Sequence, residues 1–357
     1  MKTLSMIALA GLALGLGACS RALGPMGRTL PPGDVLYYPE PPQEPRVQFL
    51  ATLSDIGDLK GWESGGPGIG KPYGLSIHKG SLYVCDTVLR GVQVFDLVRQ
   101  ELSQIRPRGE GRLPRPINCT VDTATGHLYV TDSDRRQIVE FDSTHSYVAA
   151  FGEEGGTPAD VFVDGDTLWV ADLATRSVRV YDKASRRFVR SIEGDREDPA
   201  STSAIRQPTN IWVSGNEVYV SDFGDFQVKV FDRAGAFVRL VGGYGPGLGQ
   251  FVRPKGIAVD RDQRLYVVDT GFENVQIFDR NGALLLFFGG PYTGLGDMYL
   301  PAAVDISYDP SDVEYFQAYA APGQTIEYVI LVSNQFGPDK INVYGFLAKP
   351  DTIPAGS

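Results

Sequence analysis

The sequence predicts an all-β fold, a six-bladed β-propeller, and three features of the chain carry that prediction. The same strand-turn-strand pattern occurs five times, and the second strand of each copy ends in an aspartate. Apolar residues in each copy alternate at a period of two, which is typical of strands that bury one face. The repeat length of 46, 40, 50 and 47 residues suits one four-stranded blade. It is measured between Asp86, Asp132, Asp172, Asp222 and Asp269.

Prolines mark the start of the first strand in every copy and reveal a sixth, degenerate copy. Proline lacks a backbone N–H and is tolerated at the first residue of a strand. In the sixth copy, residues 326–334 would form the second strand and residues 340–346 the third, and no fourth strand follows. The prolines are Pro72, Pro116, Pro158, Pro208, Pro254 and Pro301.

The missing fourth strand is expected near the other end of the chain. Residues 46–53 (RVQFLATL) resemble the fourth strands at 237–241 and 284–288. We expect them to complete the sixth blade, because pairing there closes the ring and removes an exposed sheet edge. The propeller would then span residues 46–347, followed by a short C-terminal tail at 348–357.

Composition agrees with a ring of short strands and restricts the partners. The chain has 357 residues with 42 glycines and 24 prolines, which suits many tight turns. A ring grows by adding repeats, so this length is compatible with one domain. The formal net charge of −10 argues against nucleic acid, because neutralising phosphates requires a basic face.

The first 18 residues predict a secretory signal peptide, with a charged start at Lys2 and an apolar run too short to span a membrane. Residues 16–19 (LGAC) resemble the lipobox of bacterial lipoproteins. The resemblance implies that Cys19 is lipidated, for example with palmitate, and becomes the first mature residue. Ser20 in place of Asp implies the outer membrane. The alternative is an ordinary leader with an unmodified cysteine. Residues 19–45 carry seven prolines and predict an extended tether.

The repeat resembles the NHL family of six-bladed propellers, most closely at residues 254–260 (PKGIAVD), 265–269 (LYVVD) and 275–279 (VQIFD). Members of that family serve as scaffolds, RNA binders, lyases and lactonases, so the resemblance implies a fold and leaves the activity open. The tether, the strand at 46–53 and residues 334–346 are similar to NHL-repeat lipoproteins found beside multihaem c-type cytochromes. That similarity implies such a cytochrome as protein partner. Any haem would belong to the partner, because the sequence has no CxxCH motif.

Polar residues are expected along the central channel. Aligning the first strands places Asn118, Asp160 and Asn210 at one inward position, and Asp305 at the inward position two residues further on. Their oxygens are ligands that calcium accepts, and lactonase propellers resemble this arrangement, although their glutamate has no match here. The alternative is a polar channel that stabilises the axis. The three histidines are predicted to be solvated turn residues, and the repeated aspartates are predicted to satisfy turn amides.

Two cysteines and one insertion complete the candidate residues. Cys85 and Cys119 belong to neighbouring blades, so they could form a disulfide in an oxidising compartment or simply be small buried residues. Residues 311–323 lengthen the first hairpin of the sixth blade and predict a short helix with Ser311 as N-cap. Its stripe of Tyr315, Phe316 and Tyr319 would either cover the last blade or dock a partner.

These features favour a lipid-anchored propeller of the cell envelope that binds protein, as an accessory or assembly factor of a surface electron-transfer complex. It would need no cofactor of its own. The alternative function is a metal-dependent lyase or lactonase with its site in the channel, where the inward oxygens would hold a calcium ion.

Overall fold

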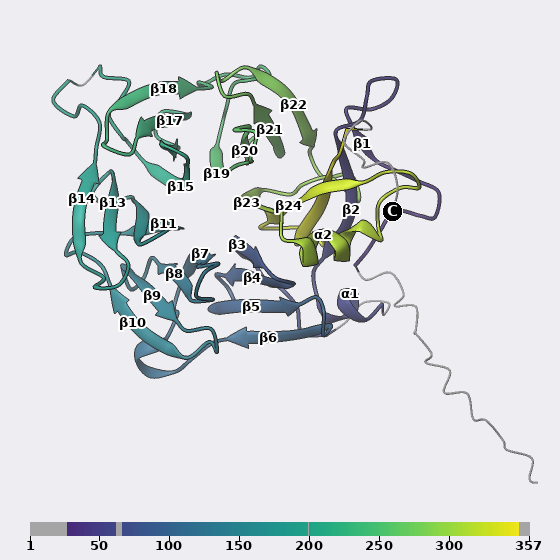
Figure 1. Cartoon of the computed structure of the whole chain (residues 1–357), viewed down its shortest axis with the longest axis horizontal. Coiled ribbons are helices and arrows are strands. Elements are labelled where there is room, and N and C mark those ends of the chain that lie inside the picture. Colours follow the sequence, from purple (N-terminus) through teal and green to yellow (C-terminus); the bar gives the residue numbers. More distant parts are fainter. Residues whose placement is uncertain (1–26, 62–65, 199, 350–357) are drawn as a thin grey trace, which may run out of the picture.

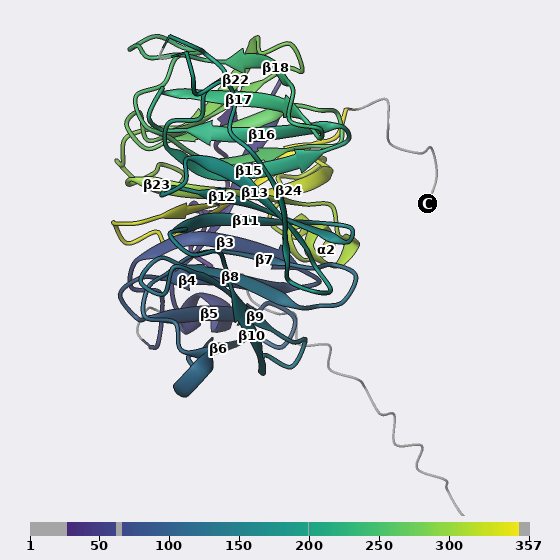
Figure 2. The same ribbon diagram turned by 90° about the vertical axis from the view of Figure 1, so that its left-hand side faces the viewer.

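The computed structural model describes residues 27–61, 66–198 and 200–349, and in this part of the chain six antiparallel sheets form a closed ring (Figure 1). In five of the sheets the first strand in the chain lies at the centre of the ring and the fourth lies at the rim (Figure 1). Figure 2 shows the ring from the side, with the connecting turns on its two faces. The fold is therefore the all-β six-bladed propeller that the sequence predicts.

Five blades follow one strand order from the centre to the rim. Blade 1 contains β3 (Pro72–His78), β4 (Ser81–Asp86), β5 (Gly91–Asp96) and β6 (Glu101–Ile105). Blade 2 contains β7 (Pro116–Val121), β8 (Leu128–Asp132), β9 (Gln137–Phe141) and β10 (Tyr147–Phe151). Blade 3 contains β11 (Pro158–Asp164), β12 (Thr167–Asp172), β13 (Ser177–Asp182) and β14 (Phe188–Ile192). Blade 4 contains β15 (Pro208–Ser214), β16 (Glu217–Asp222), β17 (Gln227–Asp232) and β18 (Phe237–Val241). Blade 5 contains β19 (Pro254–Val259), β20 (Leu265–Asp269), β21 (Asn274–Phe278) and β22 (Leu284–Gly289).

Blade 6 joins the two ends of the chain. Its strands are β23 (Pro301–Ser307), β24 (Ile326–Asn334), β25 (Ile341–Leu347), β2 (Val47–Leu53) and β1 (Tyr37–Tyr38). Strand β2 pairs antiparallel with β25, so that Phe49 lies opposite Tyr344 and Leu53 opposite Ile341. All seven residues of β2 are buried. This pairing is the closure by an N-terminal strand that the sequence predicts. All six first strands also begin at the predicted prolines.

The segment before β2 differs from the extended tether that its prolines predict. Strand β1 pairs with β2 as a fifth strand, and the backbones of Arg28 and Thr52 exchange two hydrogen bonds. The ring of Tyr38 packs 6.0 Å from that of Phe288. Part of this segment, including Leu30, Leu36 and Tyr38, thus packs on the propeller, because apolar and aromatic residues among the prolines supply surface to bury. Cys19 and the signal peptide lie outside the described residues.

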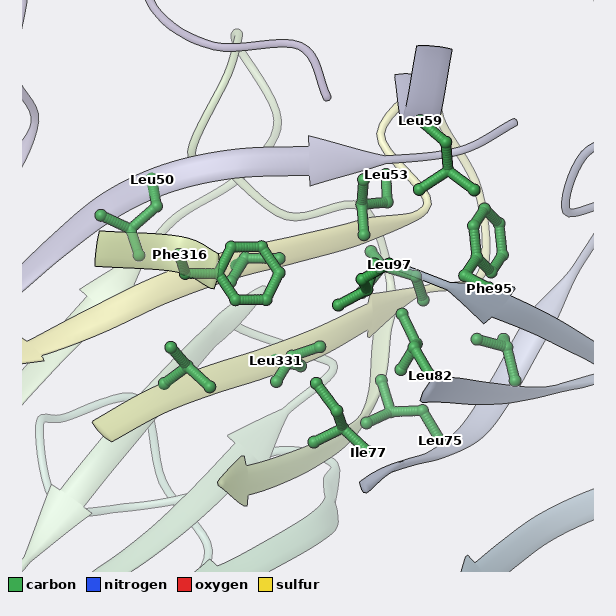
Figure 3. Packing of buried hydrophobic residues seen from close by; sticks show 14 of the residues in the cluster. Leu50, Leu53, Leu59, Leu75, Ile77, Leu82, Phe95, Leu97, Phe316 and Leu331 are labelled. Atoms are coloured by element: carbon green, nitrogen blue, oxygen red, sulfur yellow. The ribbon is translucent and has the colours of Figure 1, made fainter. Parts of the chain in front are cut away.

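An apolar cluster fills the seam between blade 6 and blade 1 (Figure 3). Strand β2 contributes Leu50 and Leu53, and the short helix α1 (Ile56–Lys60) adds Leu59. Blade 1 contributes side chains from β3, β4 and β5, while Leu331 comes from β24. Burial of this surface favours the closed ring, since each buried aliphatic side chain contributes roughly 1.5–3 kcal/mol.

The insertion in blade 6 forms helix α2 (Pro310–Gln317) on one face of the ring (Figure 2). Its N-cap is Asp309 and not Ser311, because Pro310 takes the first helical position, where its missing N–H costs nothing. Phe316 is only 1% exposed, and Tyr315 and Tyr319 pack partly buried against the seam cluster. The stripe therefore covers the closing blade, and Phe316 is not available for the docking role considered for it.

One short helical turn remains to be described. A single turn of 3-10 helix, η1 (Gly109–Gly111), lies between β6 and β7. No helix within the described residues is long and apolar enough to cross a membrane.

Replacing Phe49 with Asp tests ring closure. Phe49 is 2% exposed and packs edge-on against Tyr344 with ring centroids 5.6 Å apart. The variant loses this packing, which costs about 3–5 kcal/mol for a phenylalanine, and it also buries an unpaired charge. We expect chemical denaturation to show loss of most of the free energy of unfolding, which is about 5–15 kcal/mol for a typical protein.

The matched control is Val238→Asp, which places the same charge on the outer strand of blade 4, where Val238 is 46% exposed. It should change the free energy of unfolding by about 0.5 kcal/mol or less. If Phe49→Asp unfolds at the same denaturant concentration as this control, β2 does not hold the ring closed.

Candidate site in the central channel

The channel along the ring axis contains a cavity of about 510 Å³. Side chains from the first strands of all six blades line it. The structure brings the four inward residues of the sequence analysis together there, since the lining includes Asn118, Asp160, Asn210 and Asp305. Their shared inward position follows from the alternation of side chains along each first strand.

Asp160 links blade 3 to blade 4. Its Oδ2 accepts hydrogen bonds from the Ile211 backbone N–H at 2.9 Å and from Asn210 Nδ2 at 3.3 Å. Its Oδ1 accepts from the Val161 N–H at 2.8 Å. Burial, opposed by these hydrogen bonds and assisted by the nearby Asp305 carboxyl, raises the pKa of Asp160 to about 7.

Asp305 makes an equivalent link from blade 6 to blade 1. Its Oδ2 accepts from the Ile77 N–H at 2.9 Å, and its Oδ1 accepts from the Ile306 N–H at 2.9 Å. Burial raises the pKa of Asp305 to about 7 as well. Ser76 continues the pattern, because its Oγ accepts from the Val121 N–H of blade 2 at 3.3 Å. Polar side chains of the channel therefore connect neighbouring first strands by hydrogen bonds.

The two asparagines differ in whether the side-chain oxygen accepts a hydrogen bond. Asn118 Oδ1 accepts from the Cys119 N–H at 3.1 Å and occupies the space where a side chain at Gly74 would lie, so only glycine fits there. Asn210 is 3% exposed, and its Oδ1 has no hydrogen-bond partner among the described residues. An unsatisfied buried acceptor of this kind costs about 1–3 kcal/mol.

The inward residues do not fit a calcium ion. Calcium takes six to eight oxygen ligands, whereas both oxygens of Asp160 and of Asp305 already accept backbone N–H groups. In the described ranges, no three His, Cys, Asp or Glu side chains gather closely enough to hold a metal. The channel geometry therefore matches the structural alternative better than the metal site.

None of the three histidines lines the cavity. His127 Nδ1 lies 2.8 Å from Glu140 Oε1, and His145 Nε2 lies 3.3 Å from the Tyr83 hydroxyl. All three were expected to be solvated turn residues, but each is partly buried, and His127 and His145 also have side-chain partners. Neither is placed to act on a molecule in the channel.

The repeated aspartates at the ends of the second strands hold the blade turns, as the sequence predicts. Asp86 accepts N–H groups of Gly70 and Lys71 before the first strand and of Val88 and Leu89 in the next turn. Equivalent bonds connect the other four aspartates to their own blades. Asn334 takes this role in blade 6, where its Oδ1 accepts from the Tyr299 N–H.

One functional-looking group was missed by the sequence analysis. Lys229 in β17 is 0% exposed, and its ammonium lies 2.9 Å from Asp222 and also pairs with Asp225. The signal in the sequence was a lysine between two buried valines of one strand. Because side chains alternate along a strand, Lys229 lies on the opposite face of the sheet from both valines. Because this cluster lies within blade 4 and away from the cavity lining, it is a structural ion pair.

The disulfide considered as one possibility for Cys85 and Cys119 is not formed. Cys85 and Cys119 are both free thiols, and both lie buried in one apolar cluster between blades 1 and 2. Burial raises the pKa of the Cys85 thiol well above its ordinary value, so little reactive thiolate is present. The two residues behave as the small buried side chains that were the alternative.

Comparison with known proteins identifies the fold. A family model described as a 6-bladed beta-propeller matches residues 200–284, which span blade 4 and most of blade 5. No curated protein sequence is significantly similar to the chain. Solved structures of several other propellers are similar at low identity.

A gluconolactonase from Xanthomonas campestris is 16% identical with a TM-score of 0.56, covering 89% of this chain and 99% of its own. A chain of hydrazine synthase from Kuenenia stuttgartiensis is 16% identical with a TM-score of 0.51, covering 80% and 97%. An inactive variant of virginiamycin B lyase from Staphylococcus aureus, solved with quinupristin, is 12% identical with a TM-score of 0.51, covering 77% and 94%. At these identities the likeness shows a shared six-bladed propeller and no shared activity.

Removing the Lys229 ammonium should destabilise blade 4 strongly. Lys229→Ala leaves Asp222, itself 0% exposed, without its cation, and breaking a buried pair in this way costs about 3–5 kcal/mol. Denaturant unfolding measures the loss. Arg99→Ala removes a side chain that is 76% exposed and pairs with Asp96 at 3.4 Å, so it should cost about 1 kcal/mol or less. Equal losses in the two variants would contradict a buried pair.

Stability should fall as the pH rises from about 4 to about 7. Asp160 has a pKa of about 7 in the folded protein and about 3.9 when unfolded. Between these values the folded state binds more protons, so raising the pH favours unfolding. The shift of about three units corresponds to at most about 4 kcal/mol. Denaturation at several pH values should show a shallower slope for Asp160→Asn, whereas Asp262→Asn, whose side chain is 65% exposed, should leave the slope unchanged.

Proposed function

We propose that this protein binds another protein through one face of its ring and works as a non-catalytic accessory of an envelope electron-transfer complex. The single observation that carries the proposal is a set of aromatic side chains on that face, of which Tyr244, Tyr299 and Phe336 are exposed. Interfaces between proteins are enriched in aromatic residues, and exposed apolar patches mark interaction sites.

The aromatic residues form two clusters. In blade 4, the rings of Phe226 and Tyr244 lie 4.9 Å apart and those of Phe223 and Phe226 lie 6.2 Å apart. We call this group the blade 4 cluster. Tyr244 is 70% exposed although it has ring neighbours. An aromatic side chain so exposed gains most of its burial only when a partner covers it.

The second group, the blade 6 cluster, contains Tyr292, Tyr299 and Phe336. The first two rings are stacked with centroids 6.2 Å apart, and Tyr299 lies 6.0 Å from Phe336. Tyr299 and Phe336 are 44% and 43% exposed. The Lys71 ammonium lies 4.7 Å from the centre of the Phe336 ring.

Both clusters lie on the same face of the propeller. Their residues belong to turns between second and third strands and to loops that join one blade to the next. Because the strands of a blade are antiparallel, these two kinds of connection end on one side of the ring. A partner lying across blades 4 to 6 could therefore cover both clusters.

The anchoring and the nature of the partner rest on sequence resemblance. The LGAC segment supports lipidation of Cys19 and attachment to the outer membrane. Resemblance of the repeats to NHL lipoproteins found beside multihaem c-type cytochromes supports such a cytochrome as partner. The polar groups of the channel support a scaffold over an enzyme, because backbone hydrogen bonds between blades already occupy most of them.

A metal-dependent lyase or lactonase is the weaker candidate. The similar solved structures include a virginiamycin B lyase and a gluconolactonase, but only the fold connects them with this chain. The inward oxygens do not fit calcium, and no histidine borders the cavity. If the protein is such an enzyme, added calcium should raise its melting temperature, because a ligand that binds the folded state stabilises it.

Affinity capture with the full-length protein from its native membranes tests the proposal. The intact protein should retain a partner with covalently bound haem, detected by its absorbance and its mass. Tyr244→Ser combined with Tyr299→Ser should weaken capture at least tenfold, because loss of an aromatic hot spot costs about 2 kcal/mol or more.

Val98→Ser is the matched control. Val98 is 68% exposed and lies in the turn between β5 and β6, on the opposite face. It should retain the partner as well as the intact protein does. If gentle extraction yields no haem protein, or if the double variant retains it unchanged, the proposal fails.

A further inference from the structure

The cavity in the channel has an acidic lining without a cation. The carboxyls of Asp122, Asp160 and Asp305 border it, and no Lys, Arg or His side chain in the described ranges does. Asp122 is neutralised by Lys183, whose ammonium lies 2.9 Å away. Asp160 and Asp305 have no such counter-ion among the described residues. The cavity therefore favours a positively charged occupant.

One residue of the cavity lining carries an unsatisfied acceptor. Asn210 donates from Nδ2 to Asp160, which leaves its Oδ1 as a buried acceptor without a partner in the described part of the chain. The acidic lining calls for an occupant that donates hydrogen bonds.

Another wall of the cavity is aromatic. Phe162 and Trp212 stand at the inward position of blades 3 and 4 that Asp305 holds in blade 6, and their rings lie 4.9 Å apart. Both side chains are half-buried. Aromatic faces attract cations and pack against apolar groups, so this wall suits a cation that carries an apolar body.

These observations distinguish an organic cation from a metal ion. Each oxygen of Asp305 accepts one N–H, so each keeps one lone pair. That is too little for calcium, which needs six to eight oxygens, but enough for one N–H of an ammonium group. We propose that the cavity binds a small organic ammonium compound, with its nitrogen at Asp305 and its apolar body against Phe162 and Trp212.

The cavity has a suitable size and a path to solvent. Its volume of about 510 Å³ lies within the roughly 300–1,000 Å³ of small-molecule sites. Its lining reaches the exposed hairpin residues Thr123, Ala124 and Gly165. These hairpins join first and second strands, so the opening lies on the face opposite the aromatic clusters. A ligand and a protein partner could therefore bind at the same time.

Titration calorimetry with three matched probes tests this inference on the full-length protein. The probes are 2-phenylethylamine, the neutral 2-phenylethanol and the anionic 3-phenylpropionate. The amine should bind with one-to-one stoichiometry and at least tenfold more tightly than either analogue. Because burial raises the pKa of both carboxyls to about 7, amine binding at pH 7 should also release protons, detected as a buffer-dependent heat.

Two variants place the site. Asp305→Asn keeps an oxygen for the Ile77 N–H and should weaken amine binding at least tenfold, while Asp262→Asn at the surface should leave it unchanged. If Asp305→Asn does not fold, Trp212→Leu serves instead and should weaken the amine more than the alcohol. Equal binding of amine and alcohol, no binding of the amine at millimolar concentration, or binding of calcium alone would each overturn the inference. None of these outcomes bears on capture of a haem protein by the opposite face.

Discussion

The pairing of β2 with β25 is the interaction on which the rest of the structure depends. It joins the two ends of the chain within one blade, where Phe49 lies opposite Tyr344, and it is backed by an apolar seam that includes Leu53 and Phe316. A propeller without this pairing has an open sheet edge and a widened axis. The six first strands would then lose the spacing that places their inward side chains around one cavity.

The polar groups in the channel hold neighbouring blades together through hydrogen bonds. Asp160 and Asp305 each accept a backbone N–H from the next blade, which satisfies donors that face away from the strand pairing. The same burial raises the pKa of both carboxyls to about 7. Asn210 keeps one acceptor without a partner among the described residues, and each oxygen of Asp305 keeps one lone pair. Structure and ligand binding can therefore share residues because a carboxylate has more lone pairs than its backbone partners use.

The two faces of the ring have different chemistry. Exposed rings such as Tyr244 and Tyr299 gather on one face, whereas the acidic cavity opens on the other beside Thr123 and Gly165. Antiparallel strands produce this division, because alternate turns fall on alternate faces. A protein-binding face and a small-molecule site can then evolve on one scaffold without competing for space, which is consistent with the wide functional range of propellers.

The sequence by itself determined the blade count, the first-strand prolines, the closing strand and the structural role of the repeated aspartates, because these depend on local patterns that recur at a fixed period. It also identified the inward residues, since alternation along a strand fixes which side chains share a face. Only the tertiary structure decided that Tyr38 packs on the ring, that Cys85 stays a free thiol and that Lys229 is buried with two carboxylates. Each of these depends on contacts between segments far apart in the chain or on the space left between strands, which the periodic pattern of the sequence does not fix.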